Sequence, residues 1–147
     1  MACTSDDIQE SNLNMLAAGK WNLSGVITEF PIESGDTLIN IFDLETSPEC
    51  LKDDQIEISS NGDYEILIGE DQCDNTAQFF KFPHKGAWRF SSDESHIILN
   101  PGELDSTIMT IDTLYEAELR LTYIDTIPQM ILKNDSALYP ITILYTR

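Results

Sequence analysis

The chain has 147 residues, with 26 acidic and 8 basic side chains and a formal net charge of -18. That length suits one domain with a substantial core, and a hydrophobic fraction of 41% is typical of a folded chain. The negative charge excludes nucleic acid as a partner, because phosphate binding needs a basic face. No apolar run approaches the roughly 20 residues that a membrane-spanning helix requires.

The first seven residues combine a cysteine with a short acidic tract. Cys3 precedes Thr4-Ser5-Asp6-Asp7 and follows Met1-Ala2, which is the arrangement expected of an expression start joined to a mature N-terminus. A cysteine there is what remains when the leader of a bacterial lipoprotein is removed, and the tract resembles the acidic tethers of exported lipoproteins of Bacteroidetes. We therefore expect residues 1–7 to be a tether lipidated at Cys3 and residues 8–147 to be one domain. The alternative is an ordinary cysteine in a disordered leader.

Two further cysteines remain, Cys50 and Cys73. In an exported protein an even number of cysteines favours a disulfide, and two free buried thiols are the alternative. Their separation and the lack of histidine neighbours argue against a zinc site.

A short helix is expected over about residues 8–17. Ser5-Asp6-Asp7 offers an N-cap and an acidic first turn, Leu13 and Leu16 form part of an apolar side, and Gly19 would end the helix.

From Trp21 onward, apolar and polar residues alternate with period two, which predicts strands with one buried face. The turns between them include Asn61-Gly62, which predicts a type I′ hairpin, and looser turns at 91–94, 100–102 and 134–136. About eight to ten short strands joined in this way predict an all-β fold, an antiparallel up-and-down barrel. The alternating apolar positions are Trp21, Leu23 and Ile27; Ile56 and Ile58; Tyr64, Ile66 and Ile68; Trp88 and Phe90; Leu119, Leu121 and Tyr123; and Tyr139, Ile141, Ile143 and Tyr145.

An ordered series of motifs runs through the chain: Gly19-Lys20-Trp21, Cys50-Leu51-Lys52-Asp53-Asp54, Asn61-Gly62, Cys73, and Gly86-Ala87-Trp88. The series resembles the lipocalin-like lipoprotein domains of Bacteroidetes, small barrels of the calycin type, over about residues 13–125. The chain departs from that pattern at residues 30–44 and after Asp125. The resemblance implies the barrel fold and a place in the bacterial cell envelope, as an outer-membrane lipoprotein on the surface or the periplasmic face.

In such barrels the first tryptophan plugs the closed end, and a late-strand arginine packs across its ring. The resemblance implies this structural role for Trp21. Arg120 is the predicted partner, with Arg89 and Arg147 as alternatives.

Aromatic residues could line an apolar cavity inside the barrel, or they could simply fill it. We predict that Tyr64, Phe80, Phe82, Trp88, Phe90 and Tyr123 bind a ligand, within a wider aromatic set that adds Phe79, Tyr115 and Tyr145. The stretch 79–83 is apolar on both faces and ends at Pro83, which suits an edge, loop or lid.

The remaining polar residues give no catalytic or metal motif. The acidic residues at 53–54, 63, 70–71 and 74 match no calcium loop, so a solvated acidic rim is expected. His84 and His96 lie in no nucleophile or metal pattern.

We therefore predict a monomeric binding protein without enzymatic activity, cofactor or metal, which holds a small apolar ligand and is attached to the membrane through lipid on Cys3. The alternative is an accessory lipoprotein with a filled barrel. It would act on an outer-membrane assembly through surface segments 30–44 and 79–83.

Overall fold

A computed structural model describes residues 11–32, 35–40, 53–69, 83–126 and 138–147 of the chain. For residues 29–32, 35–40 and 126, the description covers the backbone but not the side chains. Within these ranges no helix is long and apolar enough to cross a membrane.

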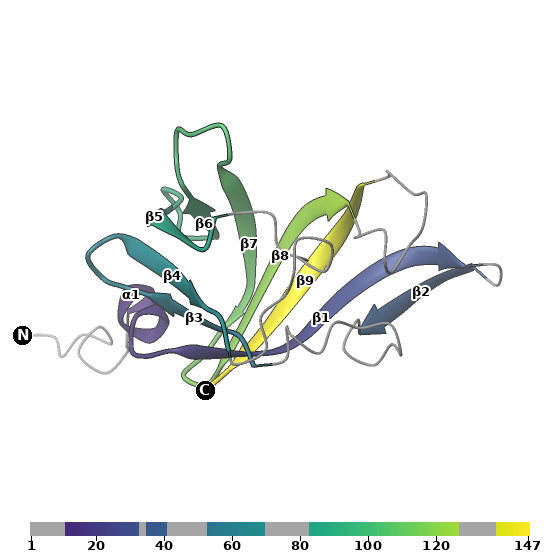
Figure 1. The fold of residues 1–147 in the computed structure, drawn as a ribbon, viewed down its shortest axis with the longest axis horizontal. Coiled ribbons are helices and arrows are strands. Elements are labelled where there is room, and N and C mark those ends of the chain that lie inside the picture. The colour runs from purple at the N-terminus through teal and green to yellow at the C-terminus, as the bar shows by residue number, and fades with distance from the viewer. Residues whose placement is uncertain (1–10, 33–34, 41–52, 70–82, 127–137) are drawn as a thin grey trace, which may run out of the picture.

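Eight antiparallel strands close into a barrel, and a ninth strand lies outside it (Figure 1). The sheet order is β2-β1-β3-β4-β5-β6-β7-β8-β9, and pairing of β9 with β1 closes the ring. β2 pairs only with the second half of β1, so these two strands extend together away from α1. The predicted all-β barrel with a short N-terminal helix is confirmed. The elements are α1 Asn12–Leu16, β1 Trp21–Ile32, β2 Gly35–Asn40, β3 Gln55–Ile58, β4 Asp63–Leu67, β5 Lys85–Phe90, β6 His96–Leu99, β7 Thr107–Leu114, β8 Glu118–Thr126 and β9 Leu138–Thr146.

The barrel has two ends that are used as landmarks below. At the helix end, α1 lies next to the start of β1 at Trp21 and the end of β9 at Thr146. At the far end, β8 ends at Thr126 and β9 begins at Leu138.

The helix is shorter than its sequence pattern predicted. Ser11 has extended backbone angles, and its hydroxyl accepts a hydrogen bond from the Asn14 N–H at 3.1 Å. Ser11 is therefore the N-cap, and the expected start at Ile8 is wrong. The expected caps at residues 5–7 lie outside the described residues. The helix ends at Leu16, before Gly19, and its apolar side carries a buried Leu16 as expected.

Strand alternation is confirmed along β3, β4, β8 and β9, and it breaks in β1. Leu23 pairs with Tyr145 but Gly25 pairs with Leu144, so Ser24 is an extra residue that forms a β-bulge. After the bulge, the side chains of β1 that regular alternation would direct outward point inward, and the reverse. Val26 and Thr28 are consequently buried, and the prediction that Ile27 points inward is wrong.

The hairpin between β3 and β4 lies where Asn61-Gly62 predicted it, but its turn type differs. Gly62 has φ 98°, whereas Asn61 is not among the described residues with positive φ. The Gly62 N–H donates to the Ser59 carbonyl at 3.1 Å, and the backbone N–H of Ser59 donates to the Asp63 carbonyl at 2.8 Å. This is the pattern of a type I turn followed by a left-handed glycine, rather than the type I′ turn expected from the sequence. The predicted turn at 134–136 lies outside the described residues.

Candidate functional site

The helix end of the barrel is closed by Trp21. Its side chain is fully buried, and its Nε1–H donates to the Leu16 carbonyl at 2.9 Å. The guanidinium of Arg147 lies over the indole, 3.8 Å from Cζ to the ring centroid. Arg147 Nε also donates to the Glu116 carbonyl at 2.7 Å, and its Nη2 donates to the Met15 carbonyl. One cation therefore joins the end of β9, the β7–β8 turn and the last turn of α1.

The prediction that Arg120 packs on Trp21 is wrong. Arg120 lies on the outer face of β8, where its side chain is 47% exposed and its Nε donates to Glu118 Oε1 at 2.8 Å. Leu119 and Leu121 on either side of it point into the core, so alternation sends Arg120 outward. Arg147 is placed differently, because it follows β9 and can turn across the barrel end.

The predicted ligand residues of β4 and β5 lie together. The Tyr64 hydroxyl donates to the Pro83 carbonyl at 2.7 Å and accepts from Asn100 Nδ2 at 2.9 Å. Trp88 Nε1–H donates to the Ser59 carbonyl at 2.8 Å, and its ring meets Phe90 edge to face at 5.0 Å. These polar atoms thus bond to the barrel itself.

The other predicted site residues are dispersed. Tyr123 lies on β8 and points into the barrel, whereas Tyr115 is 67% exposed and does not line the interior. Outside the described residues lie Cys3, Cys50, Cys73, Phe79, Phe80 and Phe82.

The side chains that face the interior differ between the two ends of the barrel. At the helix end Trp21, Leu16 and Leu119 are each 0% exposed, so the space there is filled. Toward the far end β9 turns Ile143, Ile141 and then Tyr139 inward.

Hydroxyl groups gather around Ile141. Thr28 on β1 and Tyr123 on β8 are its direct cross-strand neighbours, and Tyr139 lies two residues away on β9. Thr28 Oγ1–H donates to the Pro140 carbonyl at 3.1 Å. We call Thr28, Tyr123 and Tyr139 the far-end hydroxyl cluster. Their side chains lie around the aliphatic side chain of Ile141. Sequence reasoning missed Thr28 because the bulge at Ser24 reverses the alternation.

The buried phenols of Tyr123 and Tyr145 keep their protons at neutral pH. Burial, followed by the charge of Asp125, raises the pKa of Tyr123 well above its usual 10.0. Burial, followed by the charge of Asp54, raises the pKa of Tyr145 as well. Both hydroxyls are therefore neutral hydrogen-bonding groups rather than phenolates.

Asp54 belongs to the interior rather than to the solvated acidic rim that the sequence predicted. It is 5% exposed, and its carboxylate accepts the Gly69 N–H at 3.2 Å. Burial raises the pKa of Asp54 above the usual 3.8; the Gly69 hydrogen bond opposes this shift and the charge of Asp53 adds to it. The folded chain thus holds this proton more tightly than the unfolded chain does.

We expect Asp54→Asn to remove a pH dependence of stability. Because the native pKa is raised, the contribution of Asp54 is most favourable below 3.8 and falls as pH rises through the native pKa. The variant should therefore gain stability relative to the parent as pH rises, as measured by urea unfolding from about pH 3 to pH 7.

Asp93→Asn serves as the control with the opposite sign. Hydrogen bonds from Ser95 and Ser91 lower the pKa of Asp93 to about 2. The stability due to Asp93 is present above 3.8 and is lost as pH falls toward about 2. Parallel pH profiles for the parent and Asp54→Asn would contradict the assignment of Asp54.

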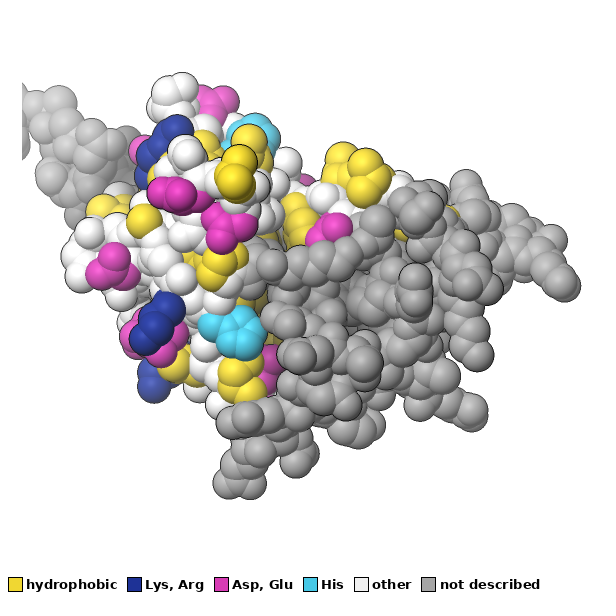
Figure 2. Space-filling model, turned by 45° about the horizontal axis from the view of Figure 1, so that its top comes forward, with side chains coloured by type: hydrophobic (Ala, Val, Ile, Leu, Met, Phe, Trp, Pro, Cys, Tyr) yellow, Lys and Arg dark blue, Asp and Glu magenta, His cyan; other side chains and the backbone are white. Residues whose placement is uncertain are grey.

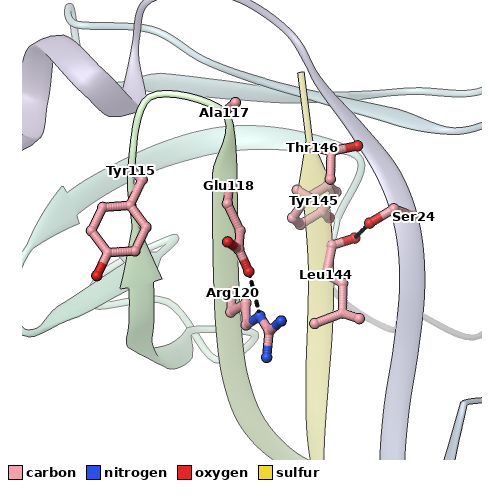
Figure 3. Close-up of a pocket in the computed structure, with 8 residues that line it drawn as sticks. All are labelled: Ser24, Tyr115, Ala117, Glu118, Arg120, Leu144, Tyr145 and Thr146. Carbon is pink, nitrogen blue, oxygen red and sulfur yellow. Dashed lines mark hydrogen bonds and ion pairs between the residues drawn. The ribbon is translucent and has the colours of Figure 1, made fainter.

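A shallow groove of about 390 Å³ lies on the outside of the barrel at the helix end. Figure 3 shows Glu118 and Arg120 on β8 between Tyr115 and the strand that carries Leu144. The ion pair between Glu118 and Arg120 occupies its centre, and both charges are already paired. We therefore assign no ligand to this groove.

The described residues contain no group of three or more His, Cys, Asp or Glu side chains that could hold a metal ion. The fold defines the class of protein as a closed antiparallel β-barrel with a capping helix. No protein-family model matches the chain, and no curated protein matches it.

Proposed function

We propose that this chain is a lipocalin-like barrel protein that binds a small, mostly apolar ligand toward the far end of its interior. The observation that carries the proposal is the far-end hydroxyl cluster around the buried aliphatic side chain of Ile141. A ligand there would gain about 25 cal/mol for each Å² of apolar surface buried, and neutral hydroxyls would orient its polar end.

The filled helix end restricts where such a ligand can lie. The side chains of Trp21, Leu16 and Leu119 are completely buried and fill the interior at the helix end. The ligand would therefore lie on the far-end side of Ile143. The core residues at the far end are also well buried; Tyr139, the most exposed of the core, is 9% exposed. Binding would therefore require inward side chains to move, and this same observation favours the filled barrel of an accessory lipoprotein as the second candidate.

Native mass spectrometry of the full-length protein, purified from the organism that encodes it, tests the proposal. We expect a mass increment that disappears on denaturation. Ile141→Phe should remove the increment because it narrows the interior, whereas Leu144→Phe on the outer face of the same strand should keep it. Thermal melting must show that both variants fold. A parent protein without a releasable increment would favour the filled barrel.

We also propose that lipid on Cys3 attaches the barrel to the bacterial envelope, since Cys3 precedes a short acidic tract. Intact mass of the denatured protein from the same source should include acyl chains, and Cys3→Ala should lack them and leave the membrane fraction. An unmodified parent mass would overturn this part of the proposal and leave the ligand proposal standing.

A further inference from the structure

Exposed aliphatic side chains are concentrated on one part of the barrel. Five large hydrophobic residues of the described chain are exposed, and four of them lie at or near the far end: Leu104 at 110%, Ile108 at 61%, Ile124 at 67% and Leu138 at 67%. The fifth, Tyr115, lies at the helix end. Isolated exposed hydrophobics are ordinary, but a contiguous group is not.

The strand register joins these residues into a row. Ile98 on β6 pairs with Ile108 on β7, and Ile124 on β8 pairs with Pro140 on β9. Ile108 and Ile124 lie on the same outer face. Ile108 precedes Thr110 by two residues and Ile124 follows Thr122 by two residues, and Thr110 and Thr122 are paired across antiparallel strands. We call Ile98, Ile108, Ile124 and Pro140 the outer aliphatic row; Leu104 and Leu138 lie at its margin.

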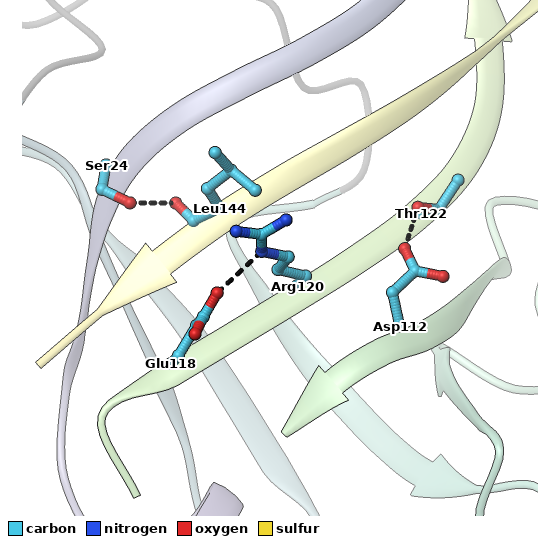
Figure 4. Close-up of polar contacts among 6 residues, drawn as sticks. All are labelled: Ser24, Asp112, Glu118, Arg120, Thr122 and Leu144. Atoms are coloured by element: carbon cyan, nitrogen blue, oxygen red, sulfur yellow. Dashed lines mark hydrogen bonds and ion pairs between the residues drawn. The ribbon is translucent and has the colours of Figure 1, made fainter. Parts of the chain in front are cut away.

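On β7, β8 and β9, the neighbouring row of the same face, toward the helix end, consists of threonines. Thr122 lies between Thr110 and Thr142, and its hydroxyl is 2.8 Å from that of Thr142. Figure 4 shows Thr122 hydrogen-bonded to Asp112, and the Arg120–Glu118 pair nearer the start of β8. Among the described residues of β7 and β8, polar side chains therefore border the aliphatic row on the side of the helix end, as a polar rim borders an interface core.

The rim of the outer aliphatic row carries acidic residues. Glu103 and Asp105 flank Leu104 in the loop before β7, and Asp112 lies beside the threonine row. Figure 2 shows hydrophobic side chains reaching the surface next to Asp and Glu side chains. Arg89 pairs with Ile98 at the β5 edge of the row, and its Nη1 already donates to the Phe90 carbonyl.

Charge decides which partner suits the outer aliphatic row. A second copy of this chain would bring another net charge of -18 to the contact, and an anionic membrane would also be repelled. A basic partner would be attracted, and pairing at the rim would speed its association.

We propose that the outer aliphatic row, with Leu104 and Leu138, is a docking surface for a protein segment whose aliphatic side chains are flanked by Lys and Arg. The aliphatic contacts supply the affinity, and the acidic rim selects the basic partner. This inference does not depend on a ligand inside the barrel, because the row faces outward.

The test uses a fluorescent helical peptide of Leu and Lys with one apolar face, measured by anisotropy against the full-length protein. Two control peptides carry Glu in place of Lys, or the same Leu and Lys residues without an apolar face. We expect binding of the first peptide only, and weakening as salt rises. The double variant Ile108→Thr/Ile124→Thr should bind at least about tenfold more weakly, and threonine keeps the branched shape that suits a strand.

The matched control is Tyr115→Ser/Leu144→Thr, which removes apolar surface at the helix end and should bind as the parent does. Equal binding by the Ile108→Thr/Ile124→Thr variant would overturn the proposal, because charge alone would then explain the affinity. Failure of the parent to bind the peptide would also overturn it. Sedimentation velocity adds a further outcome: a dimer lost in the same variant would assign the row to a second copy of the chain.

Discussion

Trp21→Ala is expected to lower the free energy of unfolding by about 3–5 kcal/mol, the usual cost of deleting a large buried aromatic side chain. The indole is fully buried, donates to the Leu16 carbonyl and supports the guanidinium of Arg147. Alanine would leave a cavity between α1 and the barrel and expose Arg147 on one side. Urea unfolding monitored by circular dichroism gives the difference directly.

Trp21→Phe separates the contributions to this loss. Phenylalanine keeps an aromatic face for Arg147 but removes the Nε1–H donor, so the Leu16 carbonyl loses its partner. We expect a smaller loss of about 1–3 kcal/mol. If Trp21→Ala changed stability by less than about 0.5 kcal/mol, Trp21 would not be closing the barrel.

Arg147→Ala is expected to lower the free energy of unfolding by about 2–4 kcal/mol, since it removes a stacked cation and charge-assisted hydrogen bonds together. Arg147 bonds to the Glu116 carbonyl and the Met15 carbonyl while it covers Trp21. Without it, those carbonyls and the indole lose their shared partner. Urea unfolding, with exchange protection of the α1 amides as a second readout, measures the effect.

Arg120→Ala is the matched control. Arg120 is half exposed and pairs with Glu118 on the outer surface, so its removal should change stability by no more than about 1 kcal/mol. In a double-mutant cycle, Trp21→Ala and Arg147→Ala should couple by about 1–2 kcal/mol, whereas Trp21→Ala and Arg120→Ala should be additive. The reverse result would restore Arg120 as the partner of the tryptophan.

Strands with one polar face were predictable from the sequence. Leu119, Leu121 and Tyr123 alternate with polar residues, and a half-buried strand imposes that period. The pattern in β9 is equally regular. Such alternation, with turns between the segments, was sufficient to predict a barrel.

The sequence pattern did not single out β6 and β7 as strands, and their composition gives the physical reason. β6 contains Ile97, Ile98 and Leu99 in succession, and β7 places Ile108 outward beside the buried Met109. The outer aliphatic row puts apolar residues on both faces of these strands, so the period of two is weakened. The feature that suggests a docking surface is therefore the feature that concealed the strands.

Local sequence determined which segments alternate, where the hairpin between β3 and β4 lies, and that Trp21 begins the first strand. Only the tertiary structure decided that Ser24 bulges, that Asp54 is buried, and that Arg147 rather than Arg120 covers Trp21. Strand period and turn chemistry depend on adjacent residues, and so they appear in the sequence. The other three depend on barrel closure, which pairs the first strand with the last and brings residues 21 and 147 into contact.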